Sequence, residues 1–177
     1  MRDDKDRTFT EAKAWPRRAL PALACGLALA TGLWLSPSSA RSLSAFAGMA
    51  GSWAGEGAID MSNGSREPIR CRARYAVGAG GSEMQQDLVC ASDSYRFSVD
   101  SNVVEDGGEI SGTWSESTRN VGGEVSGVAR AGQIQARVSG GNFVANLSVQ
   151  TNGNSQLVTI TPQGTDVRAV SVRLRKR

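Results

Sequence analysis

The stretch RCRARYAVGAGGSEMQQDLVC, residues 70–90, places two cysteines at equal distances from a central glycine pair. If Gly80 and Gly81 form the tip of a β-hairpin, Cys71 and Cys90 lie directly opposite each other on neighbouring strands. Opposed side chains in such a pair bring their Cβ atoms to about 4.5–5.5 Å, which is near disulfide range. The stretch therefore predicts a hairpin that is closed by a structural Cys71–Cys90 disulfide.

Turn motifs of the same kind recur along the chain after residue 60, at a spacing of about 8–12 residues that is typical of all-β domains. They are rich in Gly, Asn and Asp, the residues that hairpin turns require, and they read SNGS, GAGG, ASDS, EDGG, STRN, RAGQ, SGGN, TNGN and PQGT. Nine turns between consecutive strands predict about ten strands. No long stretch of helical periodicity interrupts them.

Apolar and polar side chains alternate along the expected strands, so that one face of the sheet is apolar and the other is polar and faces solvent. Hairpin pairing centred on the turns sets Leu88 against Phe97 and Val99 against Trp114 on the apolar face. An outer-membrane barrel has the opposite arrangement, with apolar residues outward. We therefore predict an all-β fold, an antiparallel up-and-down meander of about ten strands that closes into a barrel, because closure removes exposed strand edges.

The first forty residues differ from the rest of the chain. Arg17 and Arg18 precede an apolar run, and SPSSA follows it, in the order of an export signal. We predict a signal peptide at 1–40, an entry segment at 41–52 and one barrel domain at 53–177. The apolar run is shorter than the ~20 residues that span a bilayer, so we predict no stable membrane anchor and a location in the periplasm or outside the cell. The arginine pair is compatible with Sec export or twin-arginine export.

The charge balance after residue 40 is close to neutral, with 14 basic and 13 acidic side chains. A protein of this net charge lacks the overall positive field that drives binding to nucleic acid or to an anionic membrane. The sequence therefore predicts no nucleic-acid partner.

The inventory of reactive side chains is short. The chain contains no histidine, and Lys176 is the only lysine after residue 40. Together with a disulfide that uses both remaining cysteines, this excludes a Ser-His-Asp triad, a His-ligated zinc or haem, and thiol catalysis. We predict a protein that is not an enzyme and that has no cofactor and no metal site.

Aromatic side chains gather on the apolar face and are the candidates for a ligand pocket. The predicted ligand-binding residues are five aromatics and one inward carboxylate: Trp53, Tyr75, Phe97, Trp114, Phe143 and Glu116. Apolar walls with few polar groups are typical of small-molecule sites. The aromatics fit an ordinary core equally well, and Glu116 has Arg119 nearby as a pairing partner. Glycines recur on the same face, where they indicate either room for a ligand or bends that close a small barrel.

The segment FAGMAGSWAGEGAID, residues 46–60, resembles the opening of calycin barrels, the group of lipocalins, fatty-acid-binding proteins and nitrobindins. In that group a Gly-x-Trp motif begins the first strand after a short helical turn, and Gly51 and Trp53 match it. The resemblance implies a barrel that binds a small apolar or amphiphilic ligand. Nitrobindins bind haem through a histidine, so the resemblance implies no haem here.

A second resemblance is to the periplasmic metalloprotease inhibitors of bacteria, which are exported β-barrels with an early tryptophan and one disulfide. In these inhibitors a free N-terminal segment enters the protease cleft, and RSLSAF, residues 41–46, would be that segment. This resemblance implies a protein-binding module of the bacterial envelope, which would act through that segment or through the row of arginines on the polar face, Arg70, Arg72 and Arg74. It stands as the alternative to ligand binding.

Overall fold

The computed structural model describes residues 44–177, so the predicted signal peptide and residues 41–43 lie outside the described part. Within it, ten β-strands follow one another: β1 (Gly51–Met61), β2 (Arg66–Val77), β3 (Glu83–Ala91), β4 (Arg96–Asp106), β5 (Glu109–Glu116), β6 (Val121–Arg130), β7 (Gln133–Gly140), β8 (Phe143–Asn152), β9 (Ser155–Pro162) and β10 (Val167–Lys176).

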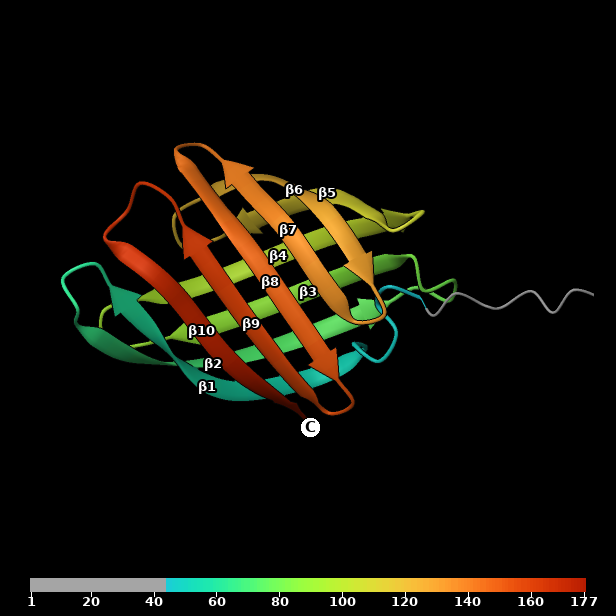
Figure 1. Cartoon of the computed structure of the whole chain (residues 1–177), viewed down its shortest axis with the longest axis horizontal. Coiled ribbons are helices and arrows are strands. Elements are labelled where there is room, and N and C mark those ends of the chain that lie inside the picture. Colours follow the sequence, from blue (N-terminus) through green and yellow to red (C-terminus); the bar gives the residue numbers. More distant parts are fainter. Residues whose placement is uncertain (1–43) are drawn as a thin grey trace, which may run out of the picture. The chain divides into compact units, whose positions relative to one another are not determined.

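Every strand pairs antiparallel with its neighbours in sequence, and β1 also pairs with β10, which closes the sheet into a barrel. The predicted fold class, an antiparallel up-and-down meander of ten strands, is confirmed. Figure 1 shows β7–β10 crossing in front of β2–β5, with the hairpin loops gathered at the two ends of the barrel. Closure leaves no strand of the ten with an unpaired edge along its length.

The predicted faces are correct, whereas most predicted cross-strand pairs are shifted by two residues. Leu88 pairs with Val99 rather than with Phe97, and Val99 pairs with Glu116 rather than with Trp114. Since side chains alternate with a period of two, a shift of two residues leaves each one on its original face. The apolar face therefore turns inward as expected, with different partners.

Turn chemistry explains the shift. In two of the loops of two residues, Gly107–Gly108 and Ala131–Gly132, both residues have positive φ, as in a type I′ turn. In the other two, Gly141–Asn142 and Gly153–Asn154, only the first residue, the glycine, has positive φ (56° and 55°). This is the pattern of a type II′ turn, in which the first central residue is glycine. The preceding Gly140 and Asn152 therefore belong to the strands and not to the loops.

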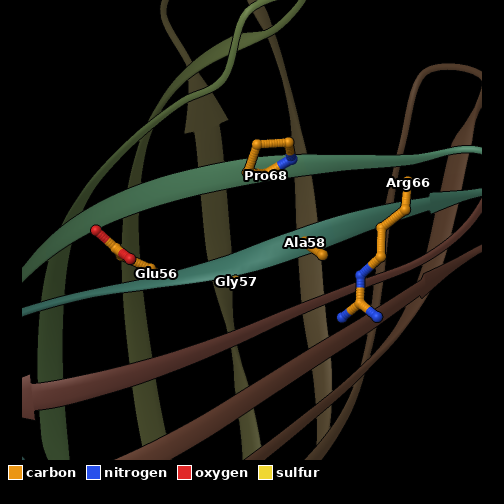
Figure 2. Close-up of a pocket in the computed structure, with 5 residues that line it drawn as sticks. All are labelled: Glu56, Gly57, Ala58, Arg66 and Pro68. Carbon is orange, nitrogen blue, oxygen red and sulfur yellow. The ribbon is translucent and has the colours of Figure 1, made fainter.

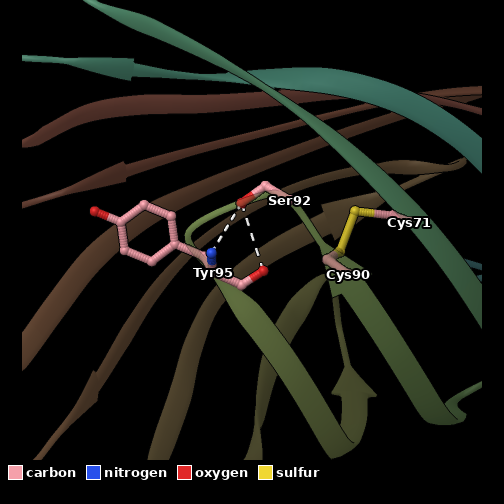
Figure 3. Close-up of a disulfide and its surroundings, with 4 residues drawn as sticks. All are labelled: Cys71, Cys90, Ser92 and Tyr95. Atoms are coloured by element: carbon pink, nitrogen blue, oxygen red, sulfur yellow. Dashed lines mark hydrogen bonds between the residues drawn. A yellow bond between two sulfur atoms is a disulfide. The ribbon is translucent and has the colours of Figure 1, made fainter.

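The disulfide lies where the sequence places it. Cys71 and Cys90 are directly opposite each other on β2 and β3, with their Cα atoms 4.1 Å apart. Figure 3 shows the bridge beside the β3–β4 turn, in which Ser92 Oγ accepts a hydrogen bond from the Tyr95 backbone N–H at 3.0 Å. Both cysteines are buried, so the bridge joins two strands inside the barrel wall.

Inward glycines mark places where one strand runs against the backbone of the next. A Cβ atom added to Gly55 would lie 1.8 Å from the Arg173 carbonyl oxygen, and one added to Gly127 would lie 2.1 Å from the Gln135 carbonyl oxygen. Gly57, Gly112 and Gly123 have the same close approach. Of the two interpretations of these glycines, the structure supports bends that close the barrel, since backbone occupies the space that a side chain would need.

Candidate functional site

The two ends of the barrel differ, and we name them by their loops. The closed end carries the β2–β3, β4–β5, β6–β7 and β8–β9 loops, and the open end carries the β1–β2, β3–β4, β5–β6, β7–β8 and β9–β10 loops. The segment 44–50 lies across the closed end, where Phe46 and Met49 are almost completely buried (0% and 1% exposed). This segment seals one mouth of the barrel with apolar side chains.

Backbone and side-chain hydrogen bonds fix the sealing segment in place. The Gly132 N–H donates to the Ala45 carbonyl at 3.0 Å, and Trp53 Nε1 donates to the Met49 carbonyl at 2.7 Å. Lys176 Nζ donates to the Gly48 carbonyl at 3.1 Å and lies 5.6 Å from the Trp53 ring centre. From Ser44 onward, therefore, the segment that would enter a protease cleft is bound to its own barrel.

Two of the predicted site residues, Trp53 and Tyr75, lie in this sealed part of the interior. Their rings meet edge to face with centres 6.4 Å apart. Tyr75 Oη donates to Gln156 Oε1 at 2.8 Å, and Gln156 Nε2 donates to Thr151 Oγ1 at 3.0 Å. Burial raises the pKa of the Tyr75 hydroxyl, which keeps it protonated as the donor. This buried polar chain is satisfied internally and forms part of the core.

The other three aromatics, Phe97, Trp114 and Phe143, lie toward the open end and are only half-buried. Trp114 and Phe143 meet at 68° with ring centres 5.8 Å apart, and Tyr95 stacks on Phe97 at 6.0 Å. These rings form two aromatic pairs toward the open end. The five predicted aromatics thus divide into a sealed pair and an open-end group.

Burial of the large apolar inward side chains changes along the barrel axis. Toward the closed end they are buried, as Met84, Val103, Ile110, Ile134 and Val149 are. Toward the open end, the large apolar inward side chains of β3, β4, β5, β7, β8 and β9 are half-buried: Leu88, Phe97, Val99, Trp114, Val138, Phe143, Leu147 and Ile160. On β1 and β2, by contrast, Ile59 and Ile69 near the open end are buried (1% and 2% exposed). The interior is therefore sealed at one end, and at the other end it is accessible along β3–β5 and β7–β9. Alternation of apolar residues finds this inward set, but it does not tell which end is sealed.

Glu116 ends β5 and anchors the β5–β6 turn. Its carboxylate accepts hydrogen bonds from the backbone N–H groups of Ser98 (3.1 Å), Thr118 (3.0 Å) and Arg119 (2.8 Å), and from Arg119 Nη1 (3.3 Å). Burial by itself would raise the pKa of Glu116, but hydrogen bonds from the Thr118 side chain and from the backbone N–H groups of Ser98, Thr118 and Arg119 outweigh it and lower the pKa to about 2. The pairing of Glu116 with Arg119, one of the two interpretations from sequence, is present.

Arg119 is a charged group beside the Tyr95–Phe97 pair. Its guanidinium carbon lies 5.1 Å from the Phe97 ring centre, which is within cation–π range. Nη1 also donates to the Arg96 carbonyl at 3.2 Å, and the side chain is 47% exposed. Glu116 therefore positions a cation at the rim of the open mouth, next to a half-buried aromatic ring.

A separate depression of about 450 Å³ lies on the outside of the barrel. Figure 2 shows its lining residues on β1 and β2: Glu56, Gly57, Ala58, Arg66 and Pro68. Ala58 is 5% exposed although its side chain points to the outer face. None of the predicted ligand-binding residues lines this depression, which is open and bordered by the Arg66–Asp60 ion pair.

Within residues 44–177 the structure contains no helix that is long and apolar enough to cross a membrane.

Two of the three comparisons with known proteins found no match. No family model matches the sequence, and no curated protein sequence is similar to it. Among solved structures, the S-type phycobiliprotein lyase CPES from Guillardia theta matches with a TM-score of 0.48 and 13% sequence identity, over 72% of this chain and 87% of that chain.

This comparison corrects one prediction. The residue inventory predicted a protein that is not an enzyme, but a solved structure that matches the barrel is named a lyase, so that prediction is contradicted. A lack of histidine and of a free thiol excludes particular chemistries and does not exclude catalysis by a barrel of this kind. The name of the Guillardia protein does not indicate a substrate for this chain.

Proposed function

We propose that this protein is an exported β-barrel that binds a small apolar or amphiphilic molecule in its interior, and that the molecule enters through the open end. The observation that carries the proposal is the axial difference in burial along β3–β5, β7 and β8: large inward side chains of these strands are buried beside the sealing segment and half-buried toward the opposite mouth. We further propose that the protein acts in the periplasm or outside the cell, on the basis of its N-terminal sequence.

Half-buried apolar side chains at the mouth supply a driving force for binding. Covering apolar surface contributes roughly 25 cal/mol per Å², and aromatic rings such as Phe97, Trp114 and Phe143 offer large flat surfaces. A ligand placed against these rings would remove from water the apolar surface that the barrel itself leaves accessible. An apolar ligand body therefore suits the open end better than the sealed end around Trp53 and Tyr75.

The rim indicates which polar group the ligand carries. The Glu116 carboxylate is occupied by three backbone N–H groups and by Arg119, so it has little capacity to receive a ligand donor. Arg119 is half-exposed and retains guanidinium N–H donors. We therefore propose that the polar end of an amphiphilic ligand is an acceptor, such as a carboxylate, that meets Arg119.

Two variants on one strand test the proposal. Val99 points inward at the accessible part of the barrel, whereas Val104 on the same strand points outward and is 50% exposed. With an environment-sensitive apolar dye such as anilinonaphthalene sulfonate, Val99→Gln should weaken binding several-fold, because it introduces a polar amide into the lumen. Val104→Gln should leave binding unchanged. Equal affinities of the two variants, or no dye binding by the unmodified protein, would refute interior binding.

Native mass spectrometry of the protein purified from the periplasm provides the second readout. A retained small molecule should appear as a discrete added mass, and it should be lost from Val99→Gln and kept by Val104→Gln. Thermal unfolding of both variants checks that each remains folded before it is compared.

A further inference from the structure

Arginines gather on one part of the outer barrel surface. β2 and β10 lie on the two sides of β1, and both direct exposed arginines outward. The group consists of Arg70, Arg72, Arg74, Arg173 and Arg175, and we call it the arginine face. In Figure 1 the three strands β10, β1 and β2 run side by side along one wall of the barrel.

The register arranges these arginines in rows across β1. Ala54 pairs with Arg72 on one side and with Arg175 on the other. Glu56 pairs in the same way with Arg70 and Arg173. Neighbouring strands are about 4.8 Å apart and alternate residues about 6.8 Å apart along a strand, so the two lines of arginines lie about 10 Å apart at the backbone. The strip between them, on β1, carries Ser52, Ala54 and Glu56.

The positive charge of the arginine face is only partly compensated. Arg70 Nε lies 3.2 Å from Glu56 Oε1, and both side chains are largely exposed (84% and 75%). Asp87 on β3 stands opposite Arg74. Among the described residues, the ion pairs that the structure contains leave Arg72, Arg173 and Arg175 without a carboxylate partner. Their other cross-strand neighbours, Val89, Leu157 and Ser155, are uncharged.

The near-neutral total charge conceals this concentration. The full chain has 20 basic and 17 acidic side chains, and a net charge of that size argues against a general attraction to polyanions. Strand pairing nevertheless brings together arginines that are about one hundred residues apart in the sequence. Local charge density, which decides electrostatic docking within a Debye length of about 8–10 Å, is therefore high on one wall of the barrel.

We propose that the arginine face docks the protein on an anionic lipid surface. Guanidinium groups bind phosphate oxygens in a bidentate manner, and each basic side chain near an anionic bilayer adds measurable binding. This peripheral docking goes beyond ligand binding in the lumen and does not depend on it.

Other polyanions fit this surface less well. Single-stranded nucleic acid requires aromatic rings for stacking, and the aromatic side chains of residues 44–177 belong to the interior or pack against it. A peptide would add to a sheet through an exposed edge, but β1 is paired on both sides. The floor of Ser52 and Ala54 also offers no anchoring pocket. A lipid surface needs only charge density, which is what the arginine face provides.

Vesicle sedimentation with two charge-matched triple variants of the full chain tests the proposal. The first variant, Arg72→Gln with Arg173→Gln and Arg175→Gln, removes three charges from the arginine face. The control, Arg130→Gln with Arg137→Gln and Arg168→Gln, removes three exposed arginines elsewhere. Because both variants keep the same N-terminal sequence, any contribution of residues 1–43 is the same in the two proteins.

The unmodified protein should sediment with phosphatidylcholine vesicles that contain phosphatidylglycerol, and high salt should release it. Each arginine removed from the face should weaken partitioning about fivefold, so the first triple variant should lose about a hundredfold. The control should lose far less. Glu56→Gln should strengthen binding, because it removes the negative charge between Arg70 and Arg173.

Three results would overturn the proposal. Equal losses in the two triple variants would assign the effect to net charge alone. Equal sedimentation with vesicles lacking phosphatidylglycerol would assign binding to apolar contacts. Arginine-face-dependent binding to soluble polyglutamate, without sedimentation on anionic vesicles, would identify an acidic polypeptide as the partner instead. Circular dichroism of each variant confirms that the barrel is folded before its binding is compared.

Discussion

Reducing the Cys71–Cys90 disulfide should lower the free energy of unfolding by about 3 kcal/mol. The bridge joins residues 19 apart in sequence, and for a closed loop of that length the chain-entropy relation gives about 3.2 kcal/mol at 25 °C. The described domain, residues 44–177, should unfold with an entropy of about 2.1 cal/mol/K per residue, so the midpoint of thermal unfolding should fall by about 11 °C.

Circular dichroism melts with and without a phosphine reductant measure this shift directly, with no change of sequence. The double variant Cys71→Ala with Cys90→Ala serves as the control, because the reductant should not alter its melting temperature. Its own midpoint should lie near or below that of the reduced protein, since it also loses two buried sulfur atoms. A reductant-induced shift below about 3 °C in the unmodified protein, the equivalent of less than 1 kcal/mol, would refute the reasoning.

Three further predictions concern the sealing segment, the glycine bends and the Glu116 carboxylate. Phe46→Ala should cost about 3–5 kcal/mol in urea unfolding, because it empties a site that is 0% exposed, whereas Val89→Ala at a half-exposed outer site should cost less than about 0.5 kcal/mol. Gly127→Ala should cost about 2 kcal/mol or more, because its Cβ would meet the Gln135 carbonyl at 2.1 Å. Gly80→Ala should be nearly neutral, since only Ser82 Oγ lies near, at 3.8 Å. The folded-state pKa of Glu116 is lowered from 4.5 to about 2, so its contribution should be complete above pH 4.5 and disappear as the pH falls through 2. The stability difference between the unmodified protein and Glu116→Gln should therefore shrink over that range in acid titrations, and a constant difference would contradict this role.

Alternation and turn composition were sufficient to predict the class of fold and the inward face, because both depend on local sequence. They were insufficient for most strand pairs, because a displacement by two residues preserves the face of every side chain. The Cys71–Cys90 pair was an exception, since the two cysteines restrict where the tip of their hairpin can lie. At the Gly141 and Gly153 loops the choice depended on glycine occupying the first loop position, whereas the β3–β4 loop, residues 92–95, contains no glycine and is longer than the expected two residues.

The site was only partly predictable, because access depends on the two ends of the barrel rather than on the faces of its strands. Trp53 and Trp114 occupy equivalent inward positions in the sequence pattern, yet one is 1% exposed and the other is half-buried. The difference arises because Phe46 and Met49 cover one mouth of the barrel. The sequence of residues 44–50 has no periodicity that predicts this contact. The row Arg70, Arg72 and Arg74 was predictable from alternation, whereas its extension by Arg173 and Arg175 was not, since that part of the arginine face forms only when β10 closes against β1.

Nuclear magnetic resonance of the labelled protein, titrated with an apolar probe, tests the central claim most directly: the barrel interior is accessible from the open end alone. The account predicts chemical-shift changes at Leu88, Phe97, Trp114 and Leu147, with the side-chain signals of Phe46, Trp53 and Val149 nearly unchanged. Changes confined to outward positions such as Val104 and Val128, or centred on the sealing segment, would contradict it.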